Sequence, residues 1–264
     1  MTDGSADPTA LLAVAEAAAD AVVPRLAASR DRAVGVDTKS TGTDMVTEFD
    51  RWSERTLVAA LREARPLDGF LGEEGASEDG SSGVVWVIDP IDGTTNFLYD
   101  LPGYSVSIAA RLDGTVVAGL VHDPIRDERF LATIDGGATR NGGPIRASGK
   151  DDLATALVAT GFSYDPDRRR AQAAVLVDVI SHIRDVRRFG GAALDLCALA
   201  CGRVDAYYER GLGVWDTAAG ALIATEAGAV IADHQPDGGA FVGAAPGIAG
   251  PFAELVERAG AHAA

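Results

Sequence analysis

The chain has 264 residues, of which 47% are hydrophobic and 23% are charged, as in soluble globular proteins with a sizeable core. Its 23 Lys and Arg residues and 39 Asp and Glu residues give a net charge of −16, which argues against nucleic acid as a direct ligand because like charges repel. The sequence shows no signal peptide and no apolar run of membrane-spanning length. With only two cysteines, Cys197 and Cys201, we predict a cytoplasmic protein that binds no membrane.

Apolar patterning in the first half of the chain predicts two helices followed by several strands. An Ala-rich stretch predicts a helix over residues 9–28, bent or ended near Pro24, and a second helix is expected over residues 50–62. A polar loop runs from Lys39 to Asp44. Strands are predicted at residues 84–88, 105–110, 116–121 and 129–133, where turn signals separate short apolar runs.

The second half alternates strands with helices. Strands are expected at residues 156–160, 186–189, 205–209 and 229–232, and helices at 168–180, 192–200, 217–226 and 251–259. This alternation predicts an α/β (α+β) fold with helices layered against a sheet. We place a boundary near Ala147, between an N-terminal half (1–146) and a C-terminal half (147–264). A tight interface is expected, because no linker-like segment separates the halves.

Acidic residues form the most informative pattern. Asp89 and Asp92 follow the predicted buried strand at 84–88. Upstream, Glu73 is one of two adjacent acids that glycines flank, and Asp216 stands just before a predicted helix. If these four carboxylates converge, they repel one another unless divalent cations neutralise them. Oxygen ligands without His or Cys favour Mg²⁺, then Mn²⁺ or Ca²⁺. The number of acids suggests more than one ion. Taken singly, each motif is more simply explained as a turn or a helix cap.

Three motifs resemble the signature motifs of the inositol monophosphatase family, which comprises lithium-sensitive, Mg²⁺-dependent phosphatases. They are Gly-Glu-Glu at 72–74, Asp-Pro-Ile-Asp-Gly-Thr-Thr-Asn-Phe at 89–97, and Trp-Asp at 215–216. Residues 188–194 and 206–209 are similar to the bacterial inositol-1-phosphatase branch. The resemblance extends over residues 39–228. It implies a layered αβαβα sandwich of the sugar-phosphatase type, a homodimer, and a small phosphorylated polyol as substrate.

The resemblance also implies a set of metal ligands. Glu73, Asp89 and the backbone carbonyl of Ile91 would hold a first Mg²⁺ ion. Asp89, Asp92 and Asp216 would hold a second, with Asp89 bridging the two. A third, weaker ion would lie near Glu73 with mostly water ligands. Two to three ions are therefore expected at each site, with Mn²⁺ as a possible substitute.

Catalytic and substrate roles follow from the same resemblance. Thr94 and Asp50 would orient or deprotonate the attacking water, with Glu73 completing the catalytic set. The loop from Lys39 to Asp44 would be mobile and close over the metals. Backbone amides of Gly93 and Thr94 would hold the phosphate, and Glu209 would accept hydrogen bonds from substrate hydroxyls. The predicted substrate-binding residues are Asp92, Gly93, Thr94, Thr95, Gly191, Ala192, Glu209 and Asp216.

The reaction expected from these residues is direct attack of a metal-activated water, without a phosphoenzyme. The sequence shows neither a Ser-His-Asp arrangement nor the phosphate-binding loop of nucleotide hydrolases. One position departs from the family, because Gly191 stands where Ser or Thr is usual. The missing hydroxyl removes one expected substrate contact and is expected to loosen specificity.

Inositol 1-phosphate is the first substrate that these motifs indicate, and residues 95–97 and 206–209 favour it. Alternatives with the same chemistry are histidinol phosphate, fructose 1,6-bisphosphate and a nucleoside bisphosphate. An alternative of another class is a regulatory binding protein that keeps the scaffold without needing catalysis. The complete set of predicted ligands argues against an inactive enzyme.

Overall fold

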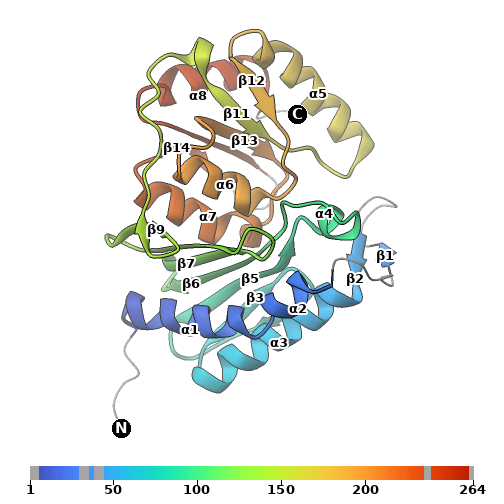
Figure 1. Cartoon of the computed structure of the whole chain (residues 1–264), viewed down its shortest axis with the longest axis vertical. Coiled ribbons are helices and arrows are strands. Elements are labelled where there is room, and N and C mark those ends of the chain that lie inside the picture. The colour runs from blue at the N-terminus through green and yellow to red at the C-terminus, as the bar shows by residue number, and fades with distance from the viewer. Residues whose placement is uncertain (1–5, 30–35, 39–44, 235–238, 262–264) are drawn as a thin grey trace.

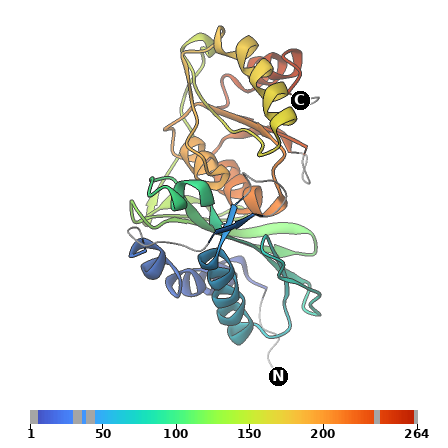
Figure 2. The same ribbon diagram turned by 90° about the vertical axis from the view of Figure 1, so that its right-hand side faces the viewer.

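The computed structural model describes residues 6–29, 36–38, 45–234 and 239–261. Five layers follow one another along the long axis (Figures 1 and 2): helices α1 and α3, an eight-stranded sheet, helices α6 and α7, a five-stranded sheet, and helices α5 and α8. The predicted αβαβα sandwich is therefore confirmed. The helices are α1 (Pro8–Asp20), α2 (Val23–Ala27), α3 (Glu48–Ala64), α4 (Thr94–Leu98), α5 (Pro166–Ile180), α6 (Ala192–Ala200), α7 (Val214–Glu226) and α8 (Ala249–Arg258).

The eight-stranded sheet has the order β10-β9-β8-β7-β6-β5-β3-β4. Its neighbouring strands are antiparallel except β3 and β5, which run parallel. Asp113 and Gly114 both have positive φ and close the tight hairpin between β6 and β7. The strands are β3 (Gly69–Gly72), β4 (Ser77–Glu78), β5 (Val84–Asp92), β6 (Ser105–Leu112), β7 (Thr115–Asp123), β8 (Glu128–Thr133), β9 (Gly137–Arg140) and β10 (Gly143–Pro144).

The five-stranded sheet has the order β12-β11-β13-β15-β14, with β12, β11 and β13 parallel and β15 antiparallel to both its neighbours. A separate antiparallel pair is formed by β1 (Val36–Thr38) and β2 (Met45–Thr47). The strands of the five-stranded sheet are β11 (Leu157–Thr160), β12 (Asp185–Arg187), β13 (Ala206–Arg210), β14 (Val230–His234) and β15 (Ala240–Ala244). The strands of the eight-stranded sheet all precede residue 147, and those of the five-stranded sheet all follow it. The division into two halves itself stays a prediction.

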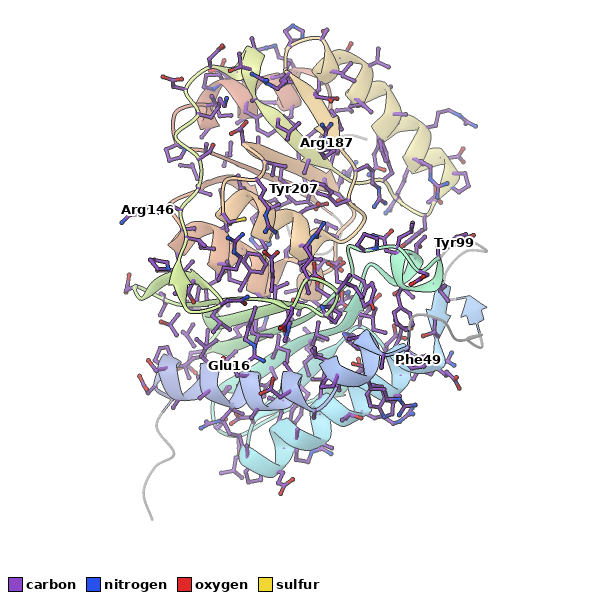
Figure 3. All side chains as sticks on the ribbon, in the orientation of Figure 1. Glu16, Phe49, Tyr99, Arg146, Arg187 and Tyr207 are labelled. Carbon is purple, nitrogen blue, oxygen red and sulfur yellow. The ribbon has the colours of Figure 1, made fainter. Side chains whose placement is uncertain are left out.

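Burial explains the arrangement of the helices. Every residue of α6 is buried, as expected for a helix covered on all sides, because it lies between the two sheets. Large side chains fill the layers in Figure 3, where Tyr207 lies inside the molecule while Tyr99 and Arg146 lie at its margin. Within the described residues, none of the helices combines the length and apolar character needed to span a membrane.

Several predicted boundaries were wrong. The helix expected over residues 9–28, bent or ended near Pro24, is two helices with a break between Asp20 and Val23, and Pro24 lies in the first turn of the second. The strand at 84–88 continues to Asp92, so both motif acids belong to β5. Asp216 lies within the first turn of α7 rather than before it. Several strands and the short helix α4 were not predicted; the strands are β1, β2, β3, β4, β9, β10 and β15. Lys39 and Asp44 lie outside the described residues.

Candidate metal centre

The end of β5 brings two aspartates into the interior. Asp89 and Asp92 are 1% and 6% exposed, and α7 adds Asp216 from the other side. Oxygen atoms of these three carboxylates all lie within 4.8 Å of one another. Asp89 and Asp92 are buried and Asp216 is half-buried. Carboxylates at this spacing are a donor set that hard divalent cations such as Mg²⁺ or Mn²⁺ prefer.

Glu73 approaches the same place from the adjacent strand. It follows β3, which pairs in parallel with β5, and its backbone N–H donates to Ile88 O at 3.2 Å. A cavity of about 230 Å³ contains all the predicted ligands. Among the residues that the structure describes, no His or Cys lines this cavity. Its lining residues are Glu73, Asp89, Ile91, Asp92, Gly93, Thr94, Tyr164, Gly211, Gly213, Trp215 and Asp216.

The acids that line this cavity raise one another's pKa values. Burial, followed by the charges of Glu73, Asp92 and Asp216, raises the pKa of Asp89 well above its usual range. Burial raises the pKa of Asp92 to about 7, although hydrogen bonds from two backbone N–H groups oppose the rise. Burial and the charge of Asp92 likewise raise the pKa of Asp216. Bound cations would relieve this repulsion.

Thr94 and Asp50 are brought together across 44 residues of sequence. Thr94 Oγ1 lies 3.0 Å from Asp50 Oδ1 and 3.0 Å from the carbonyl oxygen of Ile91. Asp50 is fully buried in the first turn of α3, where it forms a capping box with Thr47. Burial raises the pKa of Asp50, and hydrogen bonds from Thr47 and Thr94 oppose the rise.

Gly93 sits at the turn between β5 and α4 with φ of +87°. A Cβ at this position would lie 2.7 Å from Gly103 O, so both the conformation and the close approach require glycine. Gly93 and Thr94 both line the metal cavity together with the acids.

A larger cavity of about 480 Å³ adjoins the metal cavity, and the two share Asp92, Gly93, Tyr164, Gly211 and Asp216. The predicted substrate residues Gly191, Ala192 and Glu209 line it. Thr95 is placed differently: its hydroxyl lies 3.4 Å from Tyr164 OH, at an exposed position beside the cavity.

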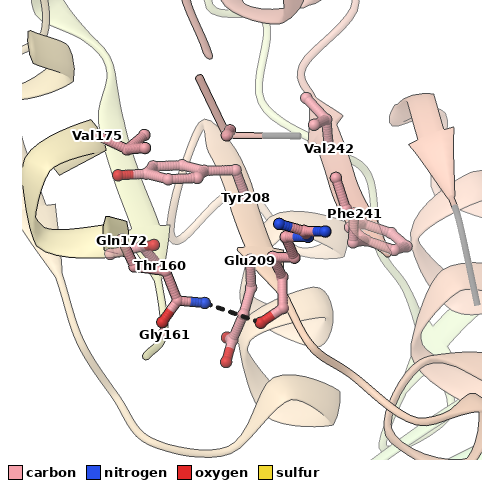
Figure 4. A pocket seen from close by; sticks show the side chains of 11 residues that line it. Thr160, Gly161, Gln172, Val175, Tyr208, Glu209, Phe241 and Val242 are labelled. Carbon is pink, nitrogen blue, oxygen red and sulfur yellow. Dashed lines mark hydrogen bonds between the residues drawn. The ribbon is translucent and has the colours of Figure 1, made fainter. Parts of the chain in front are cut away.

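Glu209 is held at the end of β13. It accepts a hydrogen bond of 2.8 Å from Tyr207 OH, and burial raises its pKa while the Arg188 guanidinium opposes the rise. Figure 4 shows its carboxylate beside Gly161. A Cβ on Gly161 would lie 2.0 Å from Glu209 Oε2, so Gly161 makes room for this carboxylate. Sequence analysis missed Gly161, since a lone glycine at a strand end carries no chemical signal.

Gly191 has a comparable role next to Asp92. It is the N-cap of α6 and offers no side-chain hydrogen bond there. Asp92 takes that place from the other half of the chain, accepting from Ala192 N at 3.1 Å and Ala193 N at 2.8 Å. A Cβ at residue 191 would lie 2.9 Å from Asp92 Oδ2. The departure from the family pattern therefore coincides with a close approach of Asp92 to the helix.

Known proteins resemble this chain over most of its length. The model of the inositol monophosphatase family matches residues 7–263. An inositol-1-monophosphatase of Mycobacterium leprae is 44% identical over 98% of this chain and 97% of the relative. A protein named Nus factor SuhB from Pasteurella multocida is 44% identical over 80% of this chain and 81% of the relative. The solved structure of Mycobacterium tuberculosis SuhB superposes with a TM-score of 0.83 at 41% identity, covering 97% of this chain and 98% of the other. A family model that spans almost the whole length, together with these relatives and the shared fold, shows that the chain belongs to the inositol monophosphatase family.

Proposed function

We propose that this protein is a Mg²⁺-dependent phosphatase that hydrolyses inositol 1-phosphate to inositol and phosphate. The observation that carries the proposal is the convergence of Glu73, Asp89 and Asp92 with Asp216 around one cavity. That cavity adjoins a second one of about 480 Å³, where a small polyol has room beside Glu209.

The donor set fits two to three Mg²⁺ ions. Glu73, Asp89 and the Ile91 carbonyl would hold one ion, and Asp89, Asp92 and Asp216 another, with a third near Glu73. Bound ions would lower the pKa of a coordinated water and stabilise the leaving oxygen. The carbonyl oxygen of Ile91 lies 3.0 Å from Thr94 Oγ1 and keeps a lone pair for a cation.

Thr94 and Asp50 are proposed to orient the attacking water. The single hydroxyl proton of Thr94 points to Asp50 or to Ile91 O, which leaves oxygen lone pairs of Thr94 to accept a hydrogen bond from water. Asp50 is held by Thr47, whose backbone N–H donates to Oδ2 at 2.8 Å, while its Oδ1 lies 3.0 Å from Thr94 Oγ1. Direct attack on phosphorus then needs no covalent intermediate with a side chain.

Glu209 is proposed to accept hydrogen bonds from the polyol, and the amides of Gly93 and Thr94 to hold the phosphate. The amide of Ala192 already donates to Asp92, so its contribution to the site is to fix a metal ligand. The expected Gly191 contact is limited to backbone atoms because glycine has no hydroxyl. A looser choice among polyol phosphates follows from this loss.

The direct test is phosphate release from D-inositol 1-phosphate with and without Mg²⁺, with Asp92→Asn as control. Release that needs Mg²⁺ and disappears in the variant supports both the site and the substrate. Hydrolysis only of histidinol phosphate, fructose 1,6-bisphosphate or a nucleoside bisphosphate would keep the chemistry and reject the substrate. Absence of release from the whole panel, in folded protein with bound Mg²⁺, would reject the phosphatase.

A second candidate is a regulatory role, because relatives named Nus factor SuhB match this chain at 42–44% identity. The partner would be a protein rather than nucleic acid, given the net charge of −16. Growth of a deletion strain supported equally by the wild-type gene and by Asp92→Asn would favour this role. Failure of the variant to support growth would favour catalysis.

We also propose a cytoplasmic homodimer that lithium inhibits, with Mn²⁺ able to replace Mg²⁺. Light scattering of the purified protein tests the dimer, because a mass of twice 27.2 kDa is expected. Phosphatase assays with added LiCl or with MnCl₂ in place of MgCl₂ test the two ion effects.

A further inference from the structure

One face of α3 contacts three segments beside the metal cavity: the end of β5, the start of α4 and the turn that follows β3. Asp50 Oδ1 lies 3.0 Å from Thr94 Oγ1, and Ser53 Oγ donates to Pro90 O at 3.2 Å, between the two motif acids. Glu54 contacts the turn that carries Glu73. Residues three and four positions apart share one face of a helix, so α3 braces the site at three points.

The contact of Glu54 is a two-point grip on the backbone. Its Oε2 accepts from Glu74 N at 2.8 Å and its Oε1 from Ala76 N at 2.9 Å. The side chain is 6% exposed. A buried carboxylate is expensive unless hydrogen bonds stabilise it, and here both oxygens are engaged by consecutive parts of one turn.

The turn itself has the shape that this grip requires. Gly72 N donates to Ala76 O at 2.6 Å, and Gly75 has φ of +114°. A Cβ on Gly72 would lie 2.2 Å from Glu54 Oε2. Glycine at position 72 is therefore what allows the Glu54 carboxylate to reach the turn.

The hydrogen bonds of Glu54 counteract electrostatic repulsion of Glu73. The charge of Glu73 raises the pKa values of Asp89, Asp92 and Asp216, which means that these acids repel it when no cation is bound. A free turn would move Glu73 away from the other acids. Two backbone hydrogen bonds to a charged acceptor oppose that movement.

We propose that Glu54 is a positioning residue for metal binding: by holding the turn between Gly72 and Ala76 from α3, it keeps Glu73 facing the aspartates of β5. This inference rests on the proposed function, because it takes Glu73 as a metal ligand. Residues that orient metal ligands typically change the affinity for the metal by about 10–100-fold when they are replaced.

The test is calorimetric titration of EDTA-treated protein with MgCl₂. Glu54→Gln keeps the shape of the side chain but has one acceptor oxygen for two N–H donors, so we expect Mg²⁺ affinity at the site that includes Glu73 to fall by about tenfold or more. Gly72→Ala keeps the charge of Glu54 and displaces its carboxylate, and the same loss is expected. Glu63→Gln is the matched control, since Glu63 is exposed on the same helix.

A second readout separates positioning from general damage. The Mg²⁺ concentration for half-maximal phosphatase activity should rise in both variants, while kcat at saturating Mg²⁺ stays within about twofold, because excess metal restores the position of Glu73. Circular dichroism checks that each variant is folded. Should Glu54→Gln fail to fold, Gly72→Ala decides the question.

The outcomes distinguish this inference from the function on which it rests. Weaker Mg²⁺ binding in Glu54→Gln and Gly72→Ala, with normal binding in Glu63→Gln, supports it. Wild-type affinity in Glu54→Gln overturns it, and so does a loss in Glu54→Gln that is absent from Gly72→Ala, since the charge alone would then explain the effect. A wild-type protein that binds no Mg²⁺ overturns the proposed metal centre itself.

Discussion

Replacing Asp92 by Asn is expected to change how the stability of the metal-free protein depends on pH. Asp92 is buried near Asp216 and Glu73, and burial raises its pKa from 3.8 to about 7. Because the pKa in the folded state lies above that in the unfolded state, the folded protein holds the proton more tightly. The stabilisation is complete below pH 4 and is lost as the pH rises through about 7.

The size of this effect follows from the pKa. At about 1.4 kcal/mol for each pKa unit, the full rise corresponds to about 4 kcal/mol. Between pH 5 and pH 8, ionisation of Asp92 should therefore reduce the free energy of unfolding of the metal-free protein by about 3 kcal/mol. Asn does not ionise, and its neutrality also relieves Asp216, whose pKa is raised partly by the Asp92 charge.

Urea unfolding of EDTA-treated protein at both pH values measures the difference. The loss between pH 5 and pH 8 should be smaller in Asp92→Asn than in wild type by about 3 kcal/mol. This double difference cancels the constant cost of the hydrogen bond to Ala192 or Ala193 that Asn cannot accept. Excess MgCl₂ should raise the free energy of unfolding of the wild-type protein at pH 8 and should not raise that of the variant. Equal pH dependence in the two proteins would refute the electrostatic reasoning.

Three further substitutions test other parts of the structure. Thr94→Val removes the hydroxyl between Asp50 and Ile91 O. We expect kcat to fall by about 100-fold or more, while the Mg²⁺ affinity measured by calorimetry stays near wild type. An unchanged kcat would contradict the proposed role of Thr94 in orienting water. Glu209→Gln keeps an acceptor for Tyr207 OH and removes a charged acceptor for the polyol, so steady-state kinetics should show KM for inositol 1-phosphate rising by about tenfold; an unchanged KM would remove Glu209 from the substrate contacts. In the wild-type protein the buried Trp86 indole N–H donates to Asp68 at 2.9 Å, and Asp68→Ala removes this acceptor. Urea unfolding should show that the free energy of unfolding falls by about 2–3 kcal/mol. Wild-type stability would show that water replaces the carboxylate.

The sequence predicted those features that depend on neighbouring residues. The strands β5 to β8 are marked by apolar runs between turn residues, and β5 delivers Asp89 and Asp92 together because both follow the run within four residues. The position of Asp216 was misjudged by a few residues, since Val214 and Trp215 resemble the end of a loop as much as the start of a helix. Strand β15 was missed because its five residues, Ala240–Ala244, include Gly and two Ala residues and lack a clear alternation.

Contacts between segments that are distant in the sequence could not be predicted from it. Glu54 accepts hydrogen bonds from a turn 20 and 22 residues away, and nothing in the helical pattern of α3 separates this acid from the exposed Glu63. The same holds for Gly161, whose importance appears only when the Glu209 carboxylate is seen in the space that a side chain would take. Such residues act through the fold, so the fold must be known before they can be recognised.

Asp92 shows why the metal centre depends on both halves of the chain. Its carboxylate caps α6 through N–H groups 100 and 101 residues away, and α6 is wholly buried between the two sheets. Asp216, from α7 in the same middle layer, completes the set of aspartates. A shift of the middle helices would therefore move Asp92 and Asp216 together and alter the spacing to Asp89. Metal binding should in turn hold β5 against α6 and α7, which links cation affinity to the packing of the layers.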